Sequence, residues 1–65
     1  MFNRNRLMAQ MALNGMNAKD VAKALGIDVS TFHRKVARDG DFSRSEINAM
    51  IDVLKIDEPK EIFFA

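Results

Sequence analysis

Apolar residues recur at spacings of three and four along most of the chain, which is the period of an α-helix with one buried face. No stretch alternates apolar and polar positions for long enough to indicate a strand. The first amphipathic segment covers about residues 3–14, with Leu7 and Met11 on its inner face. Gly15 favours its end, because glycine readily adopts the left-handed conformation that follows a helix. The pattern therefore predicts an all-α fold.

A capping signal marks the start of the second helix, which we expect over about residues 18–25. Asn17 is a favoured N-cap residue, and Asp20 stands three positions later, as a capping box requires. Val21 and Ala22 lie on the inner face of this segment. Gly26 directly follows it and predicts its end.

The third helix is predicted over about residues 29–37. Asp28 is its expected N-cap, and Phe32 and Val36 form its buried stripe. Only the three residues Gly26-Ile27-Asp28 separate it from the second helix. Two helices joined by so short a turn must pack closely on each other at a steep angle.

The fourth helix opens with the sequence FSRSEI, in which Ser43 and Glu46 form a second capping box. Its predicted core stripe comprises Ile47, Met50 or Ile51, and Leu54. Pro59 then opens a short last helix, because proline is tolerated in the first turn. These elements predict one compact domain of four to five helices over residues 1–65.

The composition excludes several classes of protein. There are no cysteines and only one histidine, so neither a disulfide framework nor a zinc site is expected. No apolar run approaches the roughly 18 residues of a membrane span. No nucleophile, base and orienting group can be assembled, so we expect no enzyme, no cofactor and no small-molecule ligand. We therefore expect a soluble protein of the cytoplasm.

The charges are divided unevenly between the two halves of the chain. Residues 1–38 carry seven basic and two acidic side chains, whereas residues 39–65 carry three basic and seven acidic ones. This asymmetry suggests that one face is suited to an anion and another is turned away from it. An uneven but purely solubilising surface is the alternative explanation.

Residues 19–35 read KDVAKALGIDVSTFHRK and follow the plan of a helix-turn-helix. Together with NRL near the start, GM before the second helix, FSRSEINAMIDVL and the IFF ending, they cover nearly the whole chain. Because these motifs occur in this order, the sequence resembles the lambda-repressor-like (Xre/Cro/CI) helix-turn-helix family, especially the small regulators of phages and prophages. It departs from the family pattern at Ala18, where a glutamine is common, and at Asp28, where serine or threonine is common.

The resemblance implies that the third helix enters the major groove of double-stranded DNA. Arg34 is the sharpest candidate, because a guanidinium can pair with O6 and N7 of guanine. The alternative is a solvated surface arginine or a phosphate contact. His33 and Thr31 are expected at the edge of the site, on a base or a phosphate. The full set of expected base contacts is Val29, Ser30, His33 and Arg34. The expected phosphate contacts are Asn17, Lys19, Thr31, Lys35 and Arg38.

Two functions remain open from the sequence. The first is a sequence-specific transcriptional regulator that occupies an operator and excludes polymerase. The second is a protein-interaction module on the same fold, such as an antirepressor. The low net charge, Ala18, Asp28 and the apolar tail favour it. A homodimer, if it forms, is expected to use the C-terminal helices through Leu54, Phe63 and Phe64.

Overall fold

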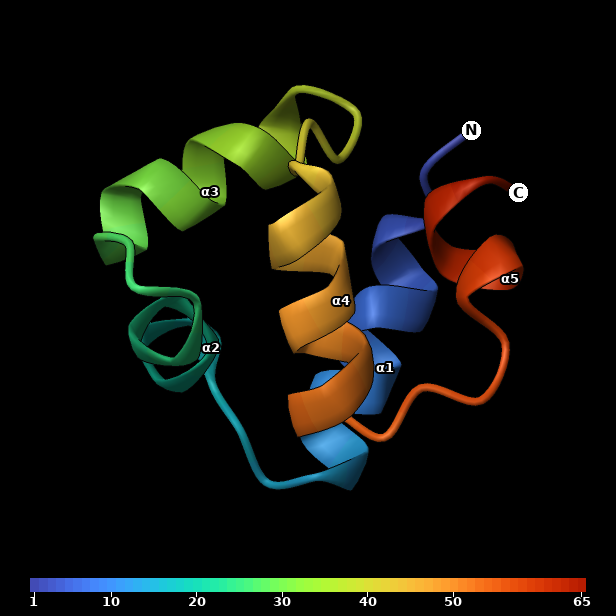
Figure 1. Ribbon diagram of the computed structural model, residues 1–65, viewed down its shortest axis with the longest axis horizontal. Helices are drawn as coiled ribbons and strands as arrows, with labels where there is room; N and C mark the ends of the chain where they lie inside the picture. Colours follow the sequence, from blue (N-terminus) through green and yellow to red (C-terminus); the bar gives the residue numbers. More distant parts are fainter.

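Five helices and no strand make up the computed structural model, which describes all residues 1–65 (Figure 1). Helix α2 packs against both α3 and α4, whereas α1 packs against α5. The α2–α3 pair therefore lies on one side of α4 and α5 on the other (Figure 1). The helices are α1 (Arg4–Leu13), α2 (Ala18–Leu25), α3 (Val29–Ala37), α4 (Arg44–Val53) and α5 (Pro59–Phe63). The predicted all-α fold and the number of helices are confirmed.

The helices begin where the capping signals predicted. The side chain of Asn17 accepts a hydrogen bond from the backbone N–H of Asp20, whose carboxylate accepts one from the N–H of Asn17. Ser43 and Glu46 form the same reciprocal pair at the start of α4. Each box satisfies two backbone donors that a helix start leaves without a partner.

Glycines in the left-handed conformation lie in two different environments. Gly26 caps α2 at φ 72°, and a Cβ at this position would meet no atom within 4 Å. Gly40 has a similar φ of 69°, but a Cβ there would overlap the ring of Phe2. Gly26 is thus required by the backbone alone, whereas Gly40 is required by both the backbone and the packing of the N-terminal segment.

Twelve buried side chains form one hydrophobic core, and none of the buried residues is polar or charged. Phe32 is fully buried and its ring lies 5.8 Å from that of Phe42, which in turn lies 6.4 Å from that of Phe63. On α4 it is Met50, not Ile51, that occupies the core position. The core comprises Leu7, Met11, Val21, Ala22, Phe32, Val36, Phe42, Met50, Leu54, Ile56, Ile62 and Phe63.

The core includes two of the three expected dimer contacts. Leu54 is fully buried and Phe63 is 7% exposed, so both side chains pack inside their own domain. Phe63 faces inward because α5 folds back beside α1, where the apolar side chains of this last helix close the core, and Leu54 faces inward as the C-cap residue of α4. Only Phe64, at 67% exposed, remains available at the surface.

A polar side chain of α1 and that of its C-cap residue bind the end of α4. The Nε2 amide group of Gln10 donates to the carbonyl oxygen of Leu54 at 2.7 Å, and the Nδ2 group of Asn14 donates to the same oxygen at 2.7 Å. These bonds satisfy a carbonyl that the helix end leaves without an internal partner.

No helix of this fold has the length and apolar character needed to cross a membrane.

Candidate nucleic-acid interface

The turn between α2 and α3 holds the second helix in a fixed position. The helices are separated by the predicted three residues, and Ile27 in the turn packs partly buried against the core. Phe32 and Val36 anchor α3 from below, while Ala22 is small enough to let the two helices approach. Because α3 is held through one face only, its opposite face is left to solvent (Figure 1).

We call this exposed surface of the third helix the α3 face. Ser30, His33 and Arg34 are exposed on it, and Val29 and Thr31 are half-buried at its edge. All five lie in the first two turns of the helix, which is the part that reaches base edges when a helix enters the major groove.

Asp28 organises the start of the α3 face. Its carboxylate accepts a hydrogen bond from the backbone N–H of Ser30 at 3.0 Å and a second from the hydroxyl of Ser30. These two bonds, the hydroxyl one first, hold the pKa of Asp28 below its ordinary value. The carboxylate is therefore ionised at neutral pH, and the Ser30 hydroxyl donates its proton in a hydrogen bond to it.

Most cations near the α3 face have no acidic partner. Lys19, Arg34 and Arg38 are exposed and form no ion pair. At the start of α2, Asn17 uses its side-chain oxygen as a cap, while its Nδ2 group makes no hydrogen bond within the protein. Unpaired donors in this region can meet an anion without first breaking an internal contact.

Lys35 differs from the other predicted phosphate contacts. Its ammonium lies 3.2 Å from a carboxylate oxygen of Glu46 and the side chain is only 25% exposed. The hydrogen bond from the backbone N–H of Ser43, helped by Lys35, outweighs desolvation and lowers the pKa of Glu46. Lys35 therefore joins α3 to the start of α4, a role that sequence spacing alone did not predict.

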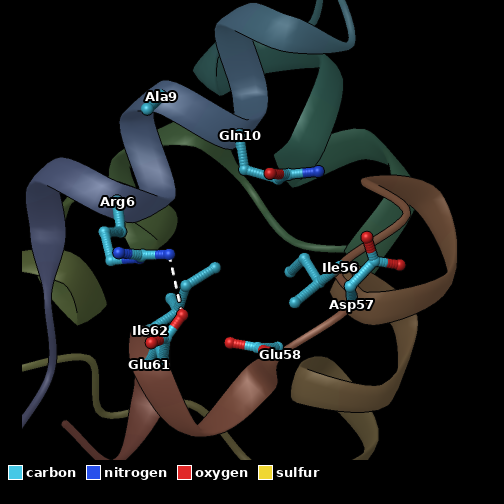
Figure 2. Close-up of a pocket in the computed structure, with 8 residues that line it drawn as sticks. All are labelled: Arg6, Ala9, Gln10, Ile56, Asp57, Glu58, Glu61 and Ile62. Atoms are coloured by element: carbon cyan, nitrogen blue, oxygen red, sulfur yellow. Dashed lines mark hydrogen bonds and ion pairs between the residues drawn. The ribbon is translucent and has the colours of Figure 1, made fainter.

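The opposite side of the molecule carries a cleft of about 470 Å³ between α1 and the segment leading into α5 (Figure 2). Asp57, Glu58 and Glu61 line it, and Arg6 pairs with Glu61 at 2.8 Å. The neighbouring Glu61 raises the pKa of Glu58 above its ordinary value. This acidic cleft would repel a polyanion, so the predicted division of charge is present in three dimensions as two distinct surfaces.

A helix-turn-helix with a polar, cationic and unobstructed second helix defines a class of protein, the DNA-binding helix-turn-helix domains. The family model for the Cro/C1-type HTH DNA-binding domain matches residues 6–64, and the chain belongs to this family. The suspected lambda-repressor-like relationship is thereby confirmed. No significant match was found among the curated proteins or among the solved structures.

Several functional features were not predicted from the sequence. The Lys35–Glu46 and Arg6–Glu61 pairs join residues of different helices, so the spacing of residues within one helix does not predict them. The contacts from Gln10 and Asn14 had a partial signal, because the two amides are four residues apart on one helix face. That spacing indicates a shared neighbour but does not identify it.

Proposed function

We propose that the protein is a sequence-specific transcriptional regulator of the Cro or repressor kind, from a phage or prophage. It would occupy an operator in double-stranded DNA of the bacterial host and exclude polymerase from it. The observation that carries this proposal is the α3 face, on which Arg34 is exposed, unpaired and backed by the fully buried Phe32. The likeness of the whole motif set to small phage regulators supports the phage assignment.

Arg34 reads a guanine in this proposal, through paired hydrogen bonds from its guanidinium to O6 and N7. Val29 lies at the edge of the helix start and suits contact with a thymine methyl group. His33 and Thr31 flank these positions and contact a base or a phosphate. Asn17, Lys19 and Arg38 bind phosphates, and Lys35 does so if it leaves Glu46.

Ser30 has a restricted role because of its contact with Asp28. A free serine hydroxyl either donates or accepts, but here its proton goes to the carboxylate. The oxygen can then only accept from a base, as can the carboxylate beside it. In the major groove the donors are the amino groups of adenine and cytosine, so the operator carries one of these bases opposite Ser30.

Two copies on a palindromic operator complete the proposal. A single module contacts few bases, and helix-turn-helix dimers bind half-sites about one helical turn, or roughly 34–36 Å, apart. Selection of bound fragments from random DNA tests both points, because it returns the sequence and spacing of any half-sites. Recovery of a palindrome with guanine in each half supports the proposal, and recovery of no enriched sequence at low salt refutes it.

An antirepressor on the same fold is the second candidate. The ionised carboxylate of Asp28 favours it, since this charge stands at the start of α3 where phosphates would approach. A band-shift assay over a salt series separates the two functions. DNA affinity that falls steeply as salt rises indicates a phosphate-binding surface. Absence of binding at low salt, together with capture of another regulator, indicates the antirepressor.

A further inference from the structure

We propose that a second copy of this chain packs antiparallel on the exposed face of α4, with a two-fold axis passing near Asn48. The α4 face is defined by Arg44, Ile47, Asn48, Ile51 and Asp52. The inference deepens the proposed function by naming the surface through which two copies meet. The role of this dimer on DNA rests on the proposed regulator function, but the association of two copies can be measured without DNA.

The surface next to the α4 face is hollow and partly apolar. A groove of about 700 Å³ runs between α4 and α5, and Ile47, Ile51, Phe42 and Phe64 supply its apolar walls. Phe64 is one of only three large hydrophobic side chains that are exposed. No residue of α2 or α3 lines this groove, so a copy seated here leaves the α3 face free.

Charge along α4 identifies the occupant. Arg44, Asn48 and Asp52 follow one another at intervals of four residues, so they form one stripe with steps of about 6 Å. All three are exposed, and neither charged group is ion-paired. The stripe runs from a cation through a neutral amide to an anion. When a second copy of α4 is turned by 180° about an axis at Asn48, the cation of each stripe faces the anion of the other.

The orientation follows from the same stripe. In an antiparallel pair, Arg44 of each copy faces Asp52 of the other, and the two Asn48 amides can bond to each other. A parallel pair would set cation against cation and anion against anion. A two-fold contact of this kind is isologous and closes at two copies, so it gives a dimer and not a chain of molecules.

The stability of α4 alone does not account for this order of charges. A helix is stabilised by acidic residues in its first turn and basic residues in its last turn, because of its macrodipole. Arg44 is the first residue of α4 and Asp52 the last but one, which is the reverse arrangement. The reversal costs the isolated helix some stability, and pairing with a second copy compensates for it.

Charge exchange tests the proposal. Arg44→Glu sets like charges together at two symmetric places, and Asp52→Arg does the same with cations. Each is expected to weaken dimerisation about tenfold or more. The double variant R44E/D52R restores both pairs with reversed sign. Each change also suits the helix dipole, so none is expected to unfold α4. Arg4→Glu is the matched control, because Arg4 is the exposed, unpaired first residue of α1.

Sedimentation equilibrium at low salt over a range of protein concentrations gives the dimer dissociation constant, and circular dichroism checks that each variant is folded. Weak dimers for the single variants, with recovery in the double variant and an unchanged Arg4→Glu control, support the proposal. A monomeric wild type, a folded Arg44→Glu variant that dimerises unchanged, or a folded double variant without recovery would overturn it. These outcomes are independent of whether DNA selection succeeds.

Discussion

The α3 face and the acidic cleft use their charged groups in opposite ways. On the α3 face, Arg34 has no acidic partner, whereas in the cleft Arg6 pairs with Glu61 at 2.8 Å (Figure 2). Both guanidinium groups lie on helices and both side chains are exposed. The difference is that folding supplies a carboxylate to one and leaves the other for a partner outside the protein. The α3 face is therefore marked by several unpaired cations close together, Arg34 with Lys19 and Arg38, and the cleft by an internal ion pair.

The two surfaces depend on a common core. Phe32 of α3 and Phe63 of α5 belong to the same hydrophobic core, and each ring packs near that of Phe42. The α3 face and the cleft are therefore carried by helices that share this core. Variants at the core affect both surfaces, while variants at one surface leave the other intact.

The largest expected effect follows from Phe32→Ala. Truncating a fully buried phenylalanine costs about 3–5 kcal/mol, which is a large part of the roughly 5–15 kcal/mol that stabilises a typical domain. Urea unfolding should therefore show a much lower midpoint, with both surfaces lost together. Leu13→Ala is the control, because its side chain is 78% exposed and its removal should change stability by less than about 0.5 kcal/mol. Equal loss in the two variants would contradict the described core.

Arg34→Ala tests whether the α3 face reads a base. Loss of a paired guanine contact should cost about 1–3 kcal/mol of discrimination at one base pair in each half-site. Band shifts with operators changed one base pair at a time measure this preference. Arg38→Ala should weaken binding to all of these operators by a similar factor, as expected for a phosphate contact. If both variants lose affinity without any change in base preference, Arg34 does not read a base.

Acid should weaken the link between α3 and α4. Glu46 has a pKa below its ordinary value of 4.5, so its carboxylate contributes stability that is complete above that value. This stability is lost as the pH falls through the lowered pKa, when Ser43 and Lys35 lose a charged partner. Asp28, whose pKa is also lowered, adds to the loss in the same direction.

Thermal melting between about pH 6 and pH 3 measures this dependence. Glu46→Gln keeps an oxygen for the Ser43 N–H but cannot form the ion pair, so the variant should be less stable at neutral pH and less sensitive to acid. Asp39→Asn serves as the control, because Asp39 is exposed and unpaired. A melting profile of the Gln variant parallel to that of the wild type would show that Glu46 carries none of the acid sensitivity.

The smallest expected effect follows from Arg6→Ala, the counterpart of Arg34→Ala in the cleft. The two side chains of the Arg6–Glu61 pair are 57% and 47% exposed, and pairs of this kind contribute about 0–1 kcal/mol. DNA binding should be unchanged, and the small loss of stability should shrink as salt rises. A base-specific loss of DNA affinity in this variant would remove the distinction between the two surfaces.

The sequence by itself determined the parts of the molecule that depend on near neighbours. The caps at Asn17, Asp28 and Ser43, the three-residue turn and the buried position of Phe32 were all predicted correctly. Each is set by hydrogen bonds or apolar spacing within three or four residues, and these interactions hold whatever surrounds the helix.

Tertiary structure decided the rest. It placed Leu54 and Phe63 in the core, paired Lys35 with Glu46, and left Phe64 exposed beside the α4 face. Each of these outcomes depends on which helix lies opposite a given side chain, and that neighbour comes from a distant part of the chain. A spacing of three or four residues tells which side of a helix is apolar, but only the packed fold tells which of those side chains remain uncovered.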